Sequence, residues 1–159
     1  MKWLKLLNGV SLNGMHPRRI ARETVLKALY AYHIANDETE KVLQDSIRWA
    51  DLDPETADYV RKLFSTTVER RDWTENLIKK YLENWDYERV ALLDRLILMM
   101  AISEIYFMDE IPPKVSISEA IEIAKVYSTE DSSGFVNGIL DTIYKHKLAE
   151  NHAAKVKVS

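Results

Sequence analysis

Three arginines and two aromatic rings near the start of the chain form a pattern suited to RNA. The side chains are Arg18, Arg19, Arg22, Tyr30 and His33. On a helical wheel of 100° per residue, all but Arg18 fall on one arc beside an apolar face. Guanidinium groups bind phosphates through paired hydrogen bonds, and a tyrosine or imidazole ring stacks on an unpaired base. The pattern therefore predicts a surface for single-stranded RNA.

The same arginines also suit an ordinary solvated helix face. A helix N-terminus favours acidic side chains, so three arginines there oppose the helix dipole and cost a little stability. This cost favours a binding surface over a merely solvated face. A further ring, Phe135, stands at the edge of an apolar face in the first turn of a later predicted helix. It either packs against a neighbouring helix or stacks on a base, and both interpretations remain open.

Motifs for catalysis or metal binding are missing from the sequence. There is no cysteine, and no H-E-x-x-H, G-x-S-x-G, Walker A or G-x-G-x-x-G pattern. The four histidines are scattered, and the acidic pairs lie at predicted helix ends, where acids usually cap or are solvated. We therefore expect neither an enzyme nor a cofactor.

Length and charge distribution agree with a binding protein. The chain has 159 residues, 47% hydrophobic and 30% charged, enough for one domain or two small subdomains. Residues 1–33 carry six basic residues against one acidic, residues 34–144 carry twelve against 23, and residues 145–159 carry four against one. Basic ends around an acidic middle suggest a polyanion site near the termini. No apolar run approaches 18 residues, so we expect a cytoplasmic protein without a membrane segment.

Helical periodicity dominates, and start signals set the boundaries. Proline at position 17 suits a first helical position, Asp53 before Pro54 predicts an N-cap, and Ser116 with Glu119 forms a capping-box pattern. The predicted helices cover about 17–35, 38–50, 54 to about 81, 87–108, 116–127 and 133–147.

The expected domain organisation follows from these helices. Residues 1–15 look like a flexible extension, and residues 16–150 form a single domain. Its N-terminal bundle covers about 16–83 and its C-terminal bundle about 86–147, joined near residues 84–86. Residues 151–159 are expected to be a frayed tail.

The helix predicted over 87–108 is apolar almost all round, so most of it should be buried. Asp94, Leu98, Ala101 and Ile105 fall on one arc of this helix. A charge-edged apolar strip of this kind predicts a protein-docking surface.

Four blocks of sequence resemble the NusB family of bacterial transcription antitermination factors. The blocks are Pro17–Glu23, Asp94–Leu98, Ile111–Lys125 and Phe135–Asp141, in the family's order and spacing over about residues 16–147. The resemblance implies an all-α fold of two small perpendicular helical bundles that share one core. It also implies a non-catalytic factor in ribosomal RNA transcription, acting with the RNA polymerase antitermination complex.

The resemblance further implies two binding surfaces. RNA of the boxA type, which is single-stranded, is expected at Arg18, Arg19, Arg22, Tyr30, Asp131, Ser132 and Phe135. The ribosomal protein NusE is expected at Glu88, Asp94 and Arg95. Alanine at position 22 should then weaken RNA binding without changing the affinity for the partner.

Three positions depart from the family pattern. Ile20 and Gly134 stand where the family often has a basic residue, and Ser118 stands where it often has asparagine. The first two reduce positive charge on the expected RNA surface. The alternative interpretation is a helical scaffold, or a homodimer formed through the helix over 87–108, that binds no RNA; the free protein could also form a homodimer.

Overall fold

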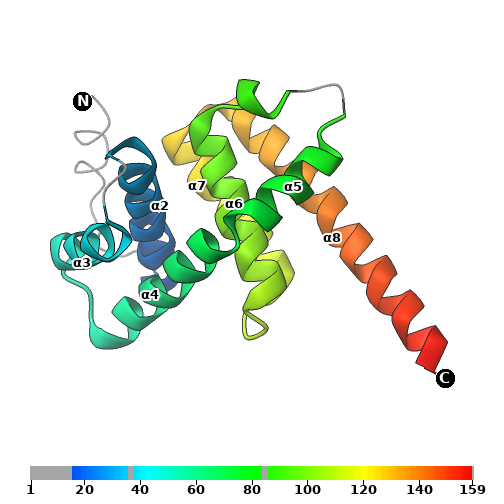
Figure 1. Ribbon diagram of the computed structural model, residues 1–159, viewed down its shortest axis with the longest axis horizontal. Coiled ribbons are helices and arrows are strands. Elements are labelled where there is room, and N and C mark those ends of the chain that lie inside the picture. Colours follow the sequence, from blue (N-terminus) through cyan, green and yellow to red (C-terminus); the bar gives the residue numbers. More distant parts are fainter. Residues whose placement is uncertain (1–15, 36–37, 84–85, 159) are drawn as a thin grey trace. The chain divides into compact units, whose positions relative to one another are not determined.

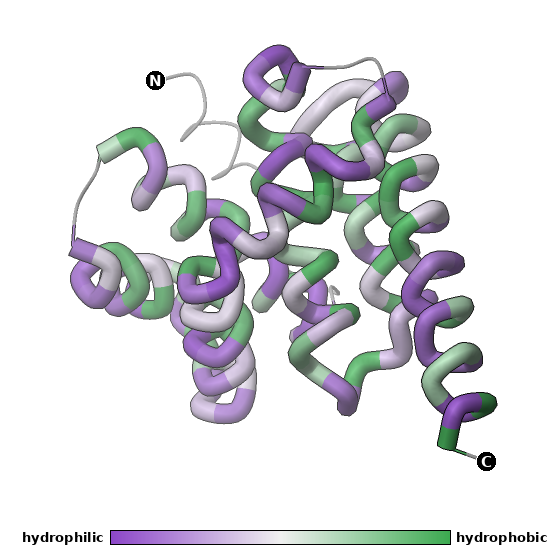
Figure 2. The backbone as a smooth tube through the Cα atoms, turned by 45° about the vertical axis from the view of Figure 1, so that its right-hand side comes forward, coloured by the Kyte–Doolittle hydropathy of each residue, from purple (hydrophilic) through white to green (hydrophobic). Residues whose placement is uncertain are grey.

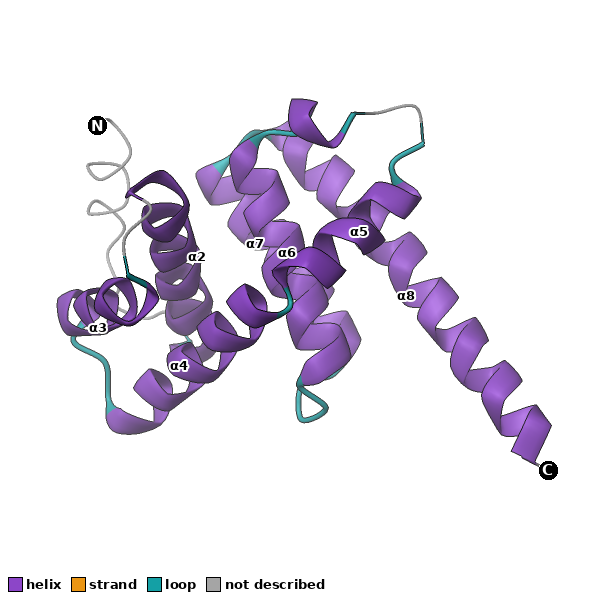
Figure 3. Cartoon of the chain, in the orientation of Figure 1, coloured by secondary structure: helices purple, strands orange, loops and turns teal. Residues whose placement is uncertain are grey.

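The computed structural model describes residues 16–35, 38–83 and 86–158, and in this part of the chain every regular element is a helix (Figure 3). The elements in chain order are α2 (Pro17–Ala35), α3 (Thr39–Ala50), α4 (Pro54–Glu69), α5 (Arg71–Tyr81), the short 3₁₀ helix η1 (Tyr87–Arg89), α6 (Leu92–Phe107), α7 (Pro113–Tyr127) and α8 (Glu130–Val158) (Figure 1). The all-α prediction is confirmed. The expected extension over 1–15 lies outside the described residues.

The chain divides into two compact units, residues 1–68 and 69–159. The first unit therefore ends well before the joint expected near residues 84–86, of which 84 and 85 lie outside the described residues. The helix predicted from 54 to about 81 is in fact two helices, α4 and α5. The interruption is at Arg70, whose ψ of 11° leaves the helical range. Neither Gly nor Pro marks this position, so the sequence carries no local signal for it.

The first unit is built from α2, α3 and α4. Apolar residues of α2 at helical spacing, including Val25 and Leu29, are buried, and so are Leu63 and Phe64 of α4. The Tyr32 ring meets the Phe64 ring edge-on, with 6.4 Å between centroids. These contacts place the N-terminal turns of α2, which carry the arginines.

Side chains cap the N-termini of both α2 and α4. The His16 Nδ1 accepts a hydrogen bond from the Arg18 backbone N–H at 3.2 Å, so α2 begins with a capping histidine followed by Pro17. Asp53 Oδ1 accepts from the Thr56 backbone N–H at 2.9 Å, and its Oδ2 accepts from the Thr56 hydroxyl at 2.8 Å. The predicted Asp53 cap is confirmed.

Replacement of Asp53 by alanine should lower the Tm by a few degrees, because the Thr56 N–H loses its acceptor. These hydrogen bonds also lower the pKa of Asp53. A lowered pKa means that the cap's contribution is complete above the unfolded pKa of about 3.9 and is lost as pH falls through the folded pKa. Thermal melts of both proteins at pH 7 and pH 2.5 check this: the difference should shrink at pH 2.5, and a constant difference would contradict it.

In the second unit, α6 lies against α5, α7 and α8. The charge-edged arc of α6 is buried: Asp94 is 5% exposed, Leu98 0%, Ala101 4% and Ile105 3%. The docking surface predicted on this arc is therefore wrong. The helix is apolar all round because packing covers it on several sides.

The capping box predicted at Ser116 is also wrong. Helix α7 begins at Pro113, three residues earlier, so Ser116 lies inside it. Its hydroxyl is buried and donates instead to Glu104 Oε1 of α6 at 2.6 Å. Ser116 thus joins two helices rather than starting one.

Helix α8 is 29 residues long and continues to Val158, beyond the predicted end at 147. Its N-terminal half packs against α6 and α7, whereas residues from 148 onward are exposed. Hydrophilic and hydrophobic residues mix along its last turns in Figure 2. The tail expected to fray is helical here. None of the helices in the described ranges combines the length and apolar content that crossing a membrane requires.

Candidate nucleic-acid interface

The candidate RNA residues of α2 gather around one ring of α4. The Arg18 guanidinium carbon stands 4.0 Å from the centroid of the Tyr59 ring, a cation–π contact. That of Arg22 stands 5.8 Å from the same centroid, and Arg22 Nη2 donates to the Tyr59 hydroxyl at 3.5 Å. Tyr59 is a site residue that the sequence did not reveal, because it lies 37 residues from Arg22 and belongs to no motif.

Burial separates the arginines into two kinds. Arg22 is 4% exposed, whereas Arg18 and Arg19 are half-buried. The arc predicted to be a continuous RNA surface is therefore closed at Arg22 and at Leu26, which is 1% exposed. The Arg22 side chain packs against Tyr59. Arg22 therefore fixes the position of the Tyr59 ring, and that ring in turn supports the Arg18 guanidinium.

The accessible part of α2 has a basic end and an aromatic end. Arg18 borders an open depression that is also lined by His16, Pro17, Asp53, Glu55 and Thr56. Two of those residues are acidic, which makes the depression itself a poor phosphate pocket. Arg19 is the next residue of α2 and is half-buried. Tyr30 is also half-buried and lies toward the C-terminal end of the helix.

The candidates on α8 form its first turns. Asp131 is exposed, Phe135 is half-buried and Ser132 is 8% exposed. Thr129 caps the helix, since its hydroxyl oxygen accepts from the Ser132 backbone N–H at 3.1 Å. An exposed carboxylate beside a partly exposed ring can accept hydrogen bonds from base amino groups while the ring stacks.

Ser132 links α8 to the candidate partner surface. Its hydroxyl donates to Asp94 Oδ2 at 2.9 Å and accepts from the Ser128 hydroxyl at 2.8 Å. Asp94 Oδ1 is buried and has no hydrogen-bond partner among the described residues. Asp94 is therefore a positioning group for the start of α8 in this structure, rather than an open contact for a partner.

The other two partner candidates remain near the surface. The Glu88 side chain is 75% exposed and lies 3.7 Å from Arg95 Nη1, whose side chain is 17% exposed. The Arg95 guanidinium also sits 5.2 Å from the centroid of the Tyr87 ring. Burial is the main cause that raises the pKa of Tyr87. Glu88 offers an exposed carboxylate to a basic partner.

The three departures from the family pattern have different surroundings. Ile20 is half-buried, and Ser118 is exposed. A Cβ placed on Gly134 would meet no atom of another part of the chain within 4 Å, so the fold does not require glycine at this position for want of space at the Cβ. Across the described ranges, no three histidine, aspartate or glutamate side chains are grouped to hold a metal ion.

Comparison with known proteins identifies the family. The family model described as "NusB family" matches residues 19–145. A transcription antitermination protein NusB of Salinibacter ruber is 44% identical over 130 residues, covering 81% of each chain. The solved structure of T. maritima NusB has 38% identity and a TM-score of 0.76, covering 82% of this chain and 92% of that one.

A second solved structure shares the fold at lower identity. It is described as antitermination factors NusB and NusE in complex with dsRNA, with 24% identity, a TM-score of 0.72, and coverage of 83% of this chain and 98% of that one. With a family model spanning most of the chain and a relative at 44% identity, the chain belongs to the NusB family of transcription antitermination proteins.

Proposed function

We propose that this protein binds boxA-type single-stranded RNA together with the ribosomal protein NusE and so supports ribosomal RNA transcription. The observation that carries the proposal is the accessible part of α2, where Arg18 and Arg19 precede Tyr30 on one helix. Cations for phosphates and a ring for a base are the two parts of a single-strand site. A solved structure of the same fold is described as NusB and NusE in complex with dsRNA, so RNA and NusE are ligand classes found with a protein of this fold.

The choice of unpaired RNA rests on the rings. A base stacks on a side chain only when it leaves the duplex, and both Tyr30 and Phe135 are partly exposed. The protein acts by binding rather than by catalysis, on nascent transcripts in the cytoplasm and within the RNA polymerase antitermination complex.

The partner compensates for a weak electrostatic attraction. The formal net charge is −3, and only a few cations face the RNA, so affinity for RNA alone is modest and sensitive to salt. A basic partner docked near the exposed Glu88 carboxylate would extend the positive surface. By linkage, RNA and partner then increase each other's affinity by the same factor.

Fluorescence anisotropy with a labelled boxA oligonucleotide, with and without NusE, tests the proposal. We expect about tenfold tighter binding with NusE, a coupling typical of linked sites. Arg19→Gln should weaken RNA binding in both conditions. Arg61→Gln, an exposed arginine of α4 in the same unit, is the matched control and should change neither. Equal affinities with and without NusE, or equal effects of the two variants, would refute the model.

A scaffold that dimerises through α6 without RNA is the competing function. It is weakened by the burial of the α6 arc, which leaves that helix little surface for a second copy. Sedimentation of the free protein, followed by an RNA titration, separates the two: a dimer that ignores RNA would favour the scaffold.

A further inference from the structure

Five aromatic rings stand in two groups on α5, α6 and α8, far along the chain from the α2 arginines. The Trp73 ring lies 4.9 Å from the Tyr106 centroid and 5.2 Å from that of Phe107. The ring centroids of Tyr81 and His146 lie 4.9 Å apart, and Lys147, the residue after His146, stands over the Tyr106 ring. We call this set the aromatic strip; it lies entirely in the second unit.

Cations stand over three rings of the aromatic strip. Arg70 lies 4.6 Å from the Phe107 centroid, Lys147 lies 5.3 Å from that of Tyr106, and Lys80 lies 5.4 Å from that of Tyr81. Arg70 and Lys80 are exposed and Lys147 is half-buried. A guanidinium or ammonium that rests on a ring keeps N–H donors for another ligand.

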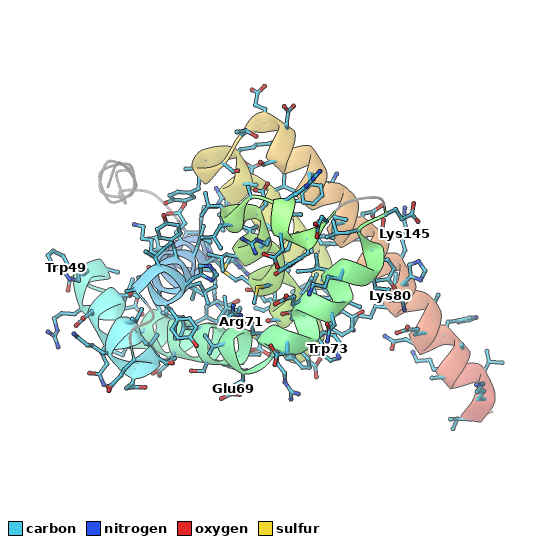
Figure 4. The ribbon with its side chains drawn as sticks, turned by 45° about the horizontal axis from the view of Figure 1, so that its top comes forward. Trp49, Glu69, Arg71, Trp73, Lys80 and Lys145 are labelled. Atoms are coloured by element: carbon cyan, nitrogen blue, oxygen red, sulfur yellow. The ribbon has the colours of Figure 1, made fainter. Side chains whose placement is uncertain are left out.

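The strip is open to solvent, although an apolar cluster of this kind is usually buried. Trp73 is 41% exposed and His146 is exposed, while Tyr81, Tyr106 and Phe107 are half-buried. Figure 4 shows Trp73 and Lys80 on α5, with Arg71 beside them along the same helix and Lys145 on the neighbouring α8.

Two carboxylates on the helices of the strip are paired with lysines of the same helices. Glu75 is paired with Lys79 at 3.0 Å, and Asp141 is paired with Lys145 at 2.8 Å, so these carboxylates are neutralised locally. Burial first, and then the charges of Glu150 and Tyr81, raise the pKa of Tyr106 to about 12. The phenol thus stays neutral at physiological pH, and its ring remains a plain stacking surface.

We propose that the aromatic strip, with Arg70, Lys80 and Lys147, is a second contact surface for single-stranded RNA. Partly exposed rings offer stacking faces for bases, and the three cations beside them offer donors for phosphates. Such stacking tolerates any base, so this surface binds RNA that flanks the specific element. The inference shares the ligand class of the proposed function but depends on no residue of α2 or of the first turns of α8.

RNA is favoured over a protein partner for the strip because of charge. The core of a protein interface is enriched in aromatic residues and arginine but depleted of lysine. Here two of the three cations over the rings are lysines, and the phosphate backbone is a ligand that such cations bind.

The test uses the full chain and a fluorescein-labelled 20-nucleotide oligouridylate, without NusE. Arg70→Gln combined with Lys147→Gln removes two cations and keeps the rings. We expect about tenfold weaker binding. Each phosphate contact contributes about 0.7 to the slope of log affinity against log salt, so loss of two contacts should make that slope shallower by about 1.4. Trp73→Leu keeps an apolar side chain but removes the flat ring, and should also weaken binding about tenfold.

Matched controls are available outside the strip. Trp49→Leu removes a tryptophan that is 88% exposed in the first unit, and Lys114→Gln removes an exposed lysine of α7. Both should leave oligouridylate binding unchanged. Circular dichroism checks the fold of every variant; if Trp73→Leu is unfolded, the charge variant decides.

The outcomes separate this inference from the proposed function. If the strip variants bind oligouridylate as tightly as the unchanged protein, while Arg19→Gln still weakens boxA binding, the second RNA surface is refuted and the proposed function stands. Strip variants that lose only NusE affinity would show a protein surface and overturn it as well. Weakened RNA binding in the strip variants, whatever Arg19→Gln does, supports it.

Discussion

Replacing Arg22 by alanine is expected to lower the free energy of unfolding by about 2–3 kcal/mol. The side chain is 4% exposed and donates to the Tyr59 hydroxyl. Its removal takes away the charged hydrogen bond and the packing of a long stem, and leaves a gap in the first unit. Urea denaturation of both proteins measures the difference.

The effect of this substitution on RNA is then indirect. The sequence predicts that Arg22 contacts RNA itself. The structure instead has Arg22 and Arg18 on the same Tyr59 ring, so alanine at 22 should loosen the support of Arg18. Arg19→Ala is the control: it should weaken RNA binding while changing stability by less than about 0.5 kcal/mol. An Arg22→Ala protein with unchanged stability but reduced RNA affinity would show that Arg22 contacts RNA directly.

Replacing Glu104 by alanine should lower the free energy of unfolding by about 3 kcal/mol. Glu104 is 1% exposed and accepts the Ser116 hydroxyl at 2.6 Å, a bond that joins α6 to α7. Alanine leaves a cavity and deprives a Ser116 hydroxyl that is almost fully buried of its acceptor. Urea denaturation again provides the measurement.

Two further variants define what Glu104 does. Glu104→Gln keeps an oxygen that can accept from Ser116, so it should lose less than half as much stability. Glu122→Ala, on the surface of α7 and paired with Lys125 at 3.2 Å, should change stability by less than about 0.5 kcal/mol. Equal losses for Glu104→Ala and Glu122→Ala would show that the buried bond is unimportant.

Local signals in the sequence were sufficient for much of the fold. Pro17 and Asp53 marked the starts of α2 and α4 correctly because capping involves residues only two or three positions apart. The apolar periodicity of the helix around residue 98 predicted its burial. The same kind of signal failed at Ser116, where a hydroxyl suited to capping is used by a carboxylate from another helix.

What the sequence could not provide depends on contacts between distant residues. The burial of Arg22 is set by Tyr59, and that of Ser132 by Asp94, 38 positions away. A helical wheel places a residue on a face but does not say which neighbour covers that face. The aromatic strip was missed for this reason: Trp73, Tyr106 and His146 come from three helices and share no motif.

The hydrogen bond between Ser132 and Asp94 also affects how genetic data on this protein should be interpreted. One residue is a candidate for the transcript and the other for the ribosomal protein, yet loss of Ser132 removes the donor to a buried carboxylate whose other oxygen has no partner among the described residues, and loss of Asp94 removes one acceptor of the Ser132 hydroxyl. Their phenotypes will be epistatic rather than additive. A selection for suppressors of a Ser132 allele should therefore yield second-site changes at Asp94, and a phenotype at either codon alone cannot assign that residue to one ligand.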